Sequence, residues 1–461
     1  MRASLPSQRV LSASAVLLVF LVSFWVRLSN LPVVGMLADS VGPWLVAWGD
    51  PFSGHAHASL YGWGLLVPYR LSLLGAESLW GAVAALQVFH ALSAPLVFLA
   101  VLALRRSALM VAIVASSLVA LDGGLLDTAR SGAEGYFAPF WVGVLLLGRI
   151  QRNTSWGPAV AWMGAAMAVM NHPLSVCVLP FLVGLPWTSR SGKLGFMLGV
   201  VLMIPSIVVG AWGPAGGSGG LSLDGLVALD AWLNEGGLAA WVLLLAPFVA
   251  LLRSESRWLG VCTLCALALL FLIGNQMDYL RDHHIRLLTL PMAVCLVAVP
   301  GRWSLVLLAV LRPPASKLPP DGSPPRPGTL GMTAGLASDV LRVELPERFY
   351  VDGAWVSGSL VAEPSAVMLD LHLRGVPLQR LQPGGDVFVV VSSQRQQLGA
   401  RPESGLVAHG DHHWLLQNPG HVPELCAEDA RRGGAWDFLS LAHPGLQTEE
   451  IGLWALSCSS D

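Results

Sequence analysis

Asp39 is a carboxylate in an apolar segment, and such a residue can act as a general base. Asp39 lies in the segment VVGMLADSVGPWLV, about a dozen residues after the first long apolar run. Partial removal of a carboxylate from water raises its pKa, and a raised pKa suits a general base. An aspartate followed by Ser40 and then by Val-Gly-Pro is equally typical of a helix N-cap or an interfacial turn. Both interpretations stay open at this point.

A second polar group follows in the sequence GDPFSGHAHASLYG, which holds Asp50, His55 and His57. The His-x-His spacing places both imidazoles on one side of an extended chain, where they can bind a divalent metal ion or an anionic ligand. Two histidines need a further metal ligand, which Asp39 or Asp50 would supply. A hydrogen-bonded loop without any ligand explains the same residues.

Two shorter polar stretches lie between apolar runs. In LDGGLLDTARSGAEGYFAPFWVG, glycines let the backbone approach a ligand closely, Arg130 is suited to holding phosphate, and Glu134 stands nearby. A solvated loop collects such charges as well. In Asn171-His172-Pro173, the proline ends a helix and His172 occupies the turn, so this group is either a capped turn or a ligand contact.

The most concentrated polar group of the apolar part is NQMDYLRDHHIRLLTLP. Arginine and histidine at a membrane surface are suited to a lipid phosphate or pyrophosphate, because they form charge-assisted hydrogen bonds with its oxygens. Interfacial anchoring by side chains that reach toward water is the alternative. The candidate binding residues in this stretch are Arg281, His283, His284 and Arg286.

The elements that must position these residues are strongly apolar. Only 12% of the 461 residues are charged, about half the roughly 25% of soluble domains. Mean hydropathy is +0.62. This composition excludes a soluble globular protein for most of the chain, and a formal net charge of −2 gives no basis for nucleic-acid binding. We expect a multi-pass protein of the cell membrane, the inner membrane if the source is a Gram-negative bacterium.

The apolar runs predict a mainly α, polytopic bundle of about ten or eleven spans over residues 1–311. The first run, 10–26, follows Arg2 and Arg9 and is read as a retained signal anchor. The stretch 27–80 is dense in Gly, Pro, Trp and Tyr and predicts interfacial helices in a first outside loop. Further spans are expected at 81–104, 107–121, 136–149, 158–171, 173–187, 194–211, 238–252, 257–274 and 287–311.

Charge placement assigns the two sides of the bundle. Arginine and lysine fall into alternate loops, after 104, 149, 187 and 252, whereas the other loops hold the acidic and histidine-bearing groups. By the positive-inside rule the candidate residues face outside. The outside loop before 238 is expected to carry Asp224, Asp230 and Glu235.

The chain changes character after residue 311. LRPPASKLPPDGSPPRPG predicts a Pro-rich linker over 312–337, and strand-like runs predict a small, mostly β soluble domain of unknown role over 338–461. Among the cysteines, Cys262 and Cys265 form a CxxC inside a buried helix, which favours core packing over metal binding. Cys426 and Cys458 can pair if the tail faces an oxidising compartment.

These segments together resemble the membrane-embedded glycosyltransferases of the GT-C superfamily, whose members include mannosyl- and arabinosyltransferases. LADSVGPWLVAWGDP is similar to the first outside loop, where Asp39 takes the place of the catalytic carboxylate. RSGAEGYFAPFWVGVLLLGRI, NHPLSVCVLP and RDHHIRLLTLPMAV resemble later segments, and the last is where arginine or histidine meets donor phosphate. The likeness covers about residues 10–311. Ser40 departs from it, because many members have a second acidic residue there, and no Asp-x-Asp metal signature is found.

The resemblance implies transfer of a hexosyl or pentosyl group from a polyprenyl-phosphate carrier to an acceptor on the outer membrane face. Asp39 would deprotonate the acceptor, and Arg281, His284 or Arg286 would neutralise the departing phosphate. A divalent metal ion is a possible cofactor, and the lipid-linked donor and membrane lipid are the expected partners. The alternatives are a lipid or small-molecule transporter or flippase, which would carry charges inside its spans, and a non-catalytic scaffold subunit.

Overall fold

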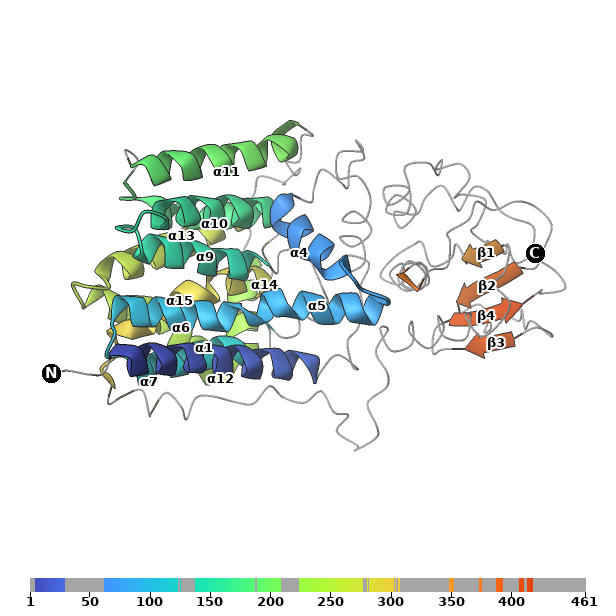
Figure 1. Ribbon diagram of the computed structural model, residues 1–461, viewed down its shortest axis with the longest axis horizontal. Helices are drawn as coiled ribbons and strands as arrows, with labels where there is room; N and C mark the ends of the chain where they lie inside the picture. The colour runs from blue at the N-terminus through green and yellow to red at the C-terminus, as the bar shows by residue number, and fades with distance from the viewer. Residues whose placement is uncertain are drawn as a thin grey trace.

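The helices of the chain pack side by side as a bundle, with their axes roughly parallel (Figure 1). The computed structural model describes residues 5–29, 62–122, 125, 137–186, 189–208, 224–276, 280, 282–301, 303, 306, 348–351, 373–374, 387–392, 406–409 and 413–417. The bundle is formed by α1 (Leu5–Leu28), α4 (Trp63–Leu73), α5 (Leu79–Ala91), α6 (Ser93–Leu104), α7 (Leu109–Ala120), α9 (Ala138–Ile150), α10 (Gly157–Asn171), the 3-10 helix η2 (Pro173–Leu182), α11 (Arg190–Val208), α12 (Asp224–Leu251), α13 (Arg257–Gln276), α14 (Asp282–Ile285), η3 (Arg286–Leu288), α15 (Thr289–Cys295) and η4 (Leu296–Ala298).

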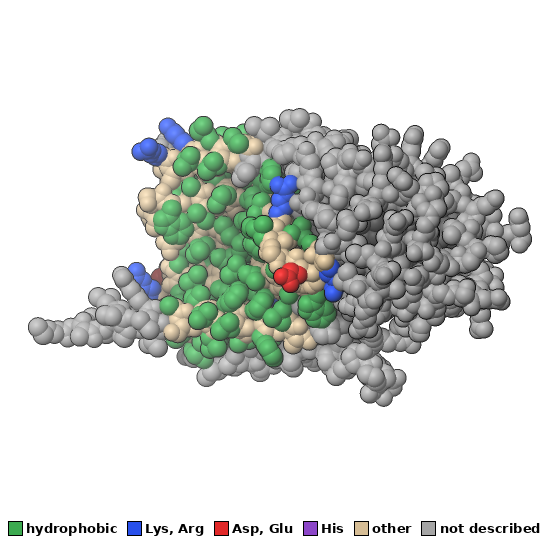
Figure 2. All heavy atoms as spheres, turned by 45° about the vertical axis from the view of Figure 1, so that its right-hand side comes forward, with side chains coloured by type: hydrophobic (Ala, Val, Ile, Leu, Met, Phe, Trp, Pro, Cys, Tyr) green, Lys and Arg blue, Asp and Glu red, His purple; other side chains and the backbone are tan. Residues whose placement is uncertain are grey.

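Each of the ten apolar runs contains helical structure, as the sequence predicted. Within the described residues, three stretches are long and apolar enough to cross a membrane: Leu79–Leu104, Gly225–Leu251 and Arg257–Asn275. Ala13–Leu28, Leu109–Ala120, Ala138–Ile150 and Arg286–Ala298 are apolar but shorter. Hydrophobic side chains cover most of the described surface in Figure 2. Such a surface is stable against lipid and would aggregate in water, so the bundle fits a membrane-spanning protein.

Hydrogen bonds at the helix ends explain where several helices begin. The hydroxyl of Ser78 accepts a hydrogen bond from the Gly81 amide at 3.1 Å and caps α5. The hydroxyl of Thr154 accepts one from the Gly157 amide at 3.0 Å at the start of α10. These side chains satisfy amide donors that have no partner in the first helical turn.

One end of the bundle collects the arginines that the sequence assigned to the inside. Arg149, at the end of α9, donates a hydrogen bond to the Val183 carbonyl at 2.7 Å and lies over the Trp258 ring, 5.0 Å from its centroid. Arg105 and Arg253 line one cavity with Val297. We call this the basic end, and the opposite end, where α10 meets η2 and α14, the polar end. The predicted separation of basic loops from histidine-bearing turns is therefore present in the structure.

The predicted outside loop with Asp224, Asp230 and Glu235 is helical, contrary to expectation. It forms the first half of α12, whose helical geometry is interrupted at Gly237, with φ 54° and ψ −138°. A side chain is strained in this region of the backbone map, so glycine is what permits the break. Gly237 separates the polar first half from the apolar segment that begins at residue 238, where the sequence placed the span.

Two local predictions have different outcomes. In the stretch 27–80, where interfacial helices were predicted, the structure has the helix α4, and its position relative to a membrane surface stays a prediction. Cys265 of the CxxC is exposed on the bundle surface, whereas the sequence placed both cysteines in a buried helix. The reason is that α13 is apolar on its exposed face as well, so hydrophobicity alone did not indicate which face is inside.

The described strands near the C-terminus form one four-stranded sheet in the order β1-β2-β4-β3. β1 (Arg348–Val351) pairs in parallel with β2 (Val387–Ser392), and β4 (His413–Gln417) pairs antiparallel with both β2 and β3 (Leu406–His409). These four strands lie within residues 338–461, the range of the predicted β domain. The extent of a β domain over 338–461 stays a prediction, and Cys426 and Cys458 lie outside the described residues.

Candidate functional site

His172 links α10 to η2 at the polar end. Its backbone is extended, with φ −153° and ψ 133°, as expected for a residue that precedes a proline. Its Nδ1 accepts a hydrogen bond from the Leu174 amide at 3.2 Å, and the residue is 6% exposed. The capped turn predicted for Asn171-His172-Pro173 is therefore present. Because Nδ1 accepts this bond, the neutral ring carries its proton on Nε2.

The His284 ring packs against the His172 ring. The ring centroids are 4.9 Å apart with an interplanar angle of 35°, and His284 is 5% exposed. His284 comes from α14, which follows α13, so the contact joins two polar stretches far apart in the chain. The structure thus brings together two of the predicted binding residues at the end of the bundle.

Arg286, two residues after His284, forms an ion pair with Glu235 of α12. Its Nη2 donates a hydrogen bond to the Glu235 carboxylate. The two partners differ in environment, because the Arg286 side chain is 4% exposed and that of Glu235 is 57% exposed. A buried cation whose counterion is hydrated can exchange that counterion for the oxygen of an anionic ligand at low cost, since the carboxylate returns to water.

Asn171, the last residue of α10, was not among the residues selected from the sequence. It is 4% exposed, and neither its amide oxygen nor its amide nitrogen has a hydrogen-bond partner among the described residues. A buried amide without partners is costly and therefore rare. Its only signal in the sequence was its place beside His172, since asparagine at a helix end is otherwise ordinary.

Helix α4 holds the end of the first outside loop against this turn. The indole nitrogen of Trp141 donates a hydrogen bond to the Gly64 carbonyl at 2.7 Å. A Cβ at Gly64 would lie 1.8 Å from the Met167 carbonyl oxygen and 2.8 Å from the backbone nitrogen of Asn171. Only glycine allows this approach. The segment that follows the Asp50–His57 group is thereby anchored beside Asn171.

A second buried polar group at the polar end involves α1 and α5. His90 is 6% exposed, and its ring stacks on Phe137 at 4.6 Å between centroids. Arg27 is 2% exposed, donates to the Ser23 carbonyl at 3.0 Å and lies within electrostatic range of His90. Sequence reasoning missed His90 because it stands inside an apolar run, where one histidine does not alter the hydrophobic pattern.

Several predicted site residues lie outside the described residues. These are Asp39, Asp50, His55, His57, Arg130, Glu134 and Arg281, together with the side chain of His283. Their convergence with His172, His284 and Arg286 stays a prediction. No group of three or more His, Cys, Asp or Glu side chains that could hold a metal ion occurs within the part of the chain that the structure describes.

The chain was compared with known proteins in three ways. No family model matches it, and no curated protein matches it. Among solved structures, the crystal structure of ArnT from Cupriavidus metallidurans in the apo state is similar with a TM-score of 0.39, and that of the same protein bound to undecaprenyl phosphate with a TM-score of 0.41. In both cases the sequences are 15% identical, and the alignment covers 90% of this chain and 98% of ArnT. Similarity at this TM-score and sequence identity does not support a conclusion about the family or function of this chain.

Proposed function

We propose that the chain is an integral membrane glycosyltransferase that moves a sugar from a polyprenyl-phosphate carrier to an acceptor on the outer membrane face. The observation that carries the proposal is the buried Arg286 at the end of an apolar bundle, paired with a carboxylate that is half in water. A lipid-borne phosphate arrives at that depth, and exchange with Glu235 gives it a desolvated cation to bind.

The proposed chemistry uses Asp39 as the general base. Its carboxylate takes the proton of the acceptor hydroxyl, whose oxygen attacks the anomeric carbon of the donor sugar. The bond from that carbon to the phosphate oxygen breaks, and its electron pair stays on the phosphate. Arg286 then stabilises the added negative charge, with His284 and His172 as neighbouring hydrogen-bond donors. Hexosyl and pentosyl donors are both compatible with this scheme.

The distribution of charge favours this reaction over transport. Among the described residues, the buried charged side chains are Arg27, Arg149 and Arg286. Arg27 stands at the end of α1, Arg149 at the end of α9, and Arg286 at the start of η3. A transporter or flippase is expected to place ionisable groups along a path through the middle of its spans. These three arginines lie at helix ends, and of the buried histidines in the described part of the chain, His90 alone stands inside an apolar run.

Release of polyprenyl phosphate from lipid-linked donors tests the proposal. Membranes containing the full chain would be supplied with polyprenyl-phosphate hexose and pentose, and the freed lipid quantified by chromatography. We expect Asp39→Asn to abolish release without lowering the amount of protein. Asp230→Asn is the matched control, because Asp230 is an exposed carboxylate on α12 that bonds only Asn234 among the described residues. Full release by the Asp39→Asn protein would remove the base assignment.

A further inference from the structure

A polar cavity lies at the basic end of the bundle, away from the proposed site. Its volume is about 230 Å³, below the roughly 300–1,000 Å³ of sites that hold drug-sized ligands. It is therefore sized for a small polar group rather than for a sugar donor with its carrier. Its lining residues are Leu104 at the end of α6, Arg105 directly after it, Arg253–Ser256 between α12 and α13, and Val297 and Ala298 of η4.

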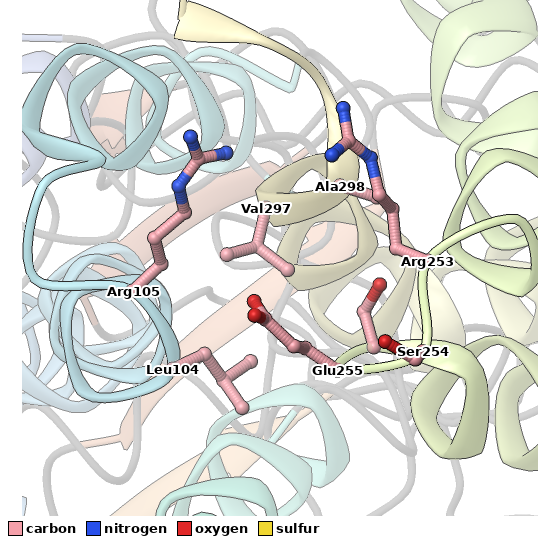
Figure 3. A pocket seen from close by; sticks show the side chains of 8 residues that line it. Leu104, Arg105, Arg253, Ser254, Glu255, Val297 and Ala298 are labelled. Carbon is pink, nitrogen blue, oxygen red and sulfur yellow. The ribbon is translucent and has the colours of Figure 1, made fainter.

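The charges around this cavity are separated rather than paired. Figure 3 shows the guanidinium groups of Arg105 and Arg253 on one side of Val297, and the Glu255 carboxylate with Ser254 on the other. Within the described part of the chain, no ion pair or side-chain hydrogen bond involves Arg105, Arg253 or Glu255. Two like charges that face one cavity repel each other, and an anion between them relieves that repulsion.

The ends of the long apolar helices indicate the depth at which the cavity would lie in a membrane. Of the three described stretches long enough to cross one, Leu79–Leu104 ends at a lining residue, and the lining loop Arg253–Ser256 connects Gly225–Leu251 to Arg257–Asn275. Where such helices end, the hydrocarbon ends, and phospholipid phosphates are concentrated there. Basic pockets between membrane helices on the arginine-rich side are suited to these headgroups.

We propose that this cavity binds the headgroup of a membrane phospholipid. Arg105 and Arg253 hold the phosphodiester oxygens, and Glu255 accepts a hydrogen bond from a hydroxyl or ammonium group at the far end of the headgroup. A choline headgroup has no such donor, so the site prefers phosphatidylglycerol and phosphatidylethanolamine. The site is independent of the glycosyl transfer proposed above, because its residues lie at the opposite end of the bundle.

Lipid binding to the delipidated full-length protein tests this site. Native mass spectrometry with phosphatidylglycerol, phosphatidylethanolamine and phosphatidylcholine gives the dissociation constants. We expect Arg105→Gln and Arg253→Gln each to weaken phosphatidylglycerol binding by about tenfold (~1.4 kcal/mol). Arg106→Gln is the control, because Arg106 is exposed in the same turn, carries the same charge and does not line the cavity. Glu255→Gln should reduce the preference over phosphatidylcholine.

Three results would overturn the proposal. An equal loss in the Arg106→Gln protein would mean that general positive charge, not the cavity, attracts the lipid. Displacement of the lipid by an equal concentration of inorganic phosphate would identify free phosphate as the ligand. Unchanged phosphatidylglycerol binding in both the Arg105→Gln and Arg253→Gln proteins would show that the cavity is not the lipid-binding site.

Discussion

The pairing of Arg286 with Glu235 separates a binding role from a structural one. If Arg286 holds the donor phosphate, Glu235 competes with that phosphate for the same guanidinium. Arg286→Gln removes a charge-assisted hydrogen bond, which contributes about 1.5–3 kcal/mol. At ~1.4 kcal/mol for each factor of ten, the dissociation constant for polyprenyl phosphate should rise roughly 10- to 150-fold.

Glu235→Gln should have the opposite effect on binding. The Glu235 side chain is 57% exposed but the Arg286 side chain is only 4% exposed, so loss of the carboxylate also lowers folding stability, because it removes an anion from beside a buried cation. Removal of the carboxylate leaves Arg286 without its competitor, so polyprenyl phosphate should bind equally well or a few times more tightly. A purely structural ion pair predicts instead that neither variant changes the affinity, although both lower the melting temperature.

The assay is a titration of purified full-length protein in detergent with polyprenyl phosphate, followed by native mass spectrometry. Asp230→Asn removes an exposed charge from the same helix and serves as the control for Glu235→Gln. The reasoning is refuted if Arg286→Gln changes the dissociation constant by less than about twofold, or if Glu235→Gln weakens binding as much as Arg286→Gln does.

Three further predictions follow from local geometry. His172→Asn should unfold near the wild-type melting temperature, because asparagine can still cap η2, and His172→Ala should unfold at a lower temperature. We expect the two variants to differ by about 1 kcal/mol in the free energy of unfolding. Equal melting temperatures would show that the His172 side chain does not act as a cap. The backbone at Gly237 has φ 54° and ψ −138°, so Gly237→Ala should lower the free energy of unfolding by about 1–3 kcal/mol. Gly301 has open space around it and no positive φ, so Gly301→Ala should change the melting temperature little in the same thermal denaturation. Cysteines introduced by Glu77→Cys and Ser155→Cys, both at exposed positions, should react with an impermeant thiol reagent from opposite sides of the membrane, and labelling of both from one side would contradict the assigned ends.

The positions of the apolar helices could be predicted from the sequence because burial in lipid requires long uncharged runs. The runs at 81–104 and 257–274 are helical, the described part of the run at 287–311 contains η3, α15 and η4, and Arg105, Arg149 and Arg253 mark one end of the bundle. The sequence-based predictions were wrong where hydrophobicity does not distinguish a loop from a helix or the buried face of a helix from its exposed face. The segment around Asp230 and Glu235 is as compatible with a surface helix as with a loop, and α13 offers no polar face to show that Cys265 points outward.

The sequence by itself determined the class of the chain, since 12% charged residues and an apolar majority leave a membrane-embedded helical bundle as the stable solution. It also placed His172, His284 and Arg286 in turns at one end. Only the tertiary structure decided that the two histidine rings touch, that Arg286 is buried against Glu235 and that the Asn171 side chain is buried without a hydrogen-bond partner among the described residues. The physical reason is that the packing of α14 against α12 and against the turn between α10 and η2 is set by side-chain shape over many residues, which no local pattern in the chain records.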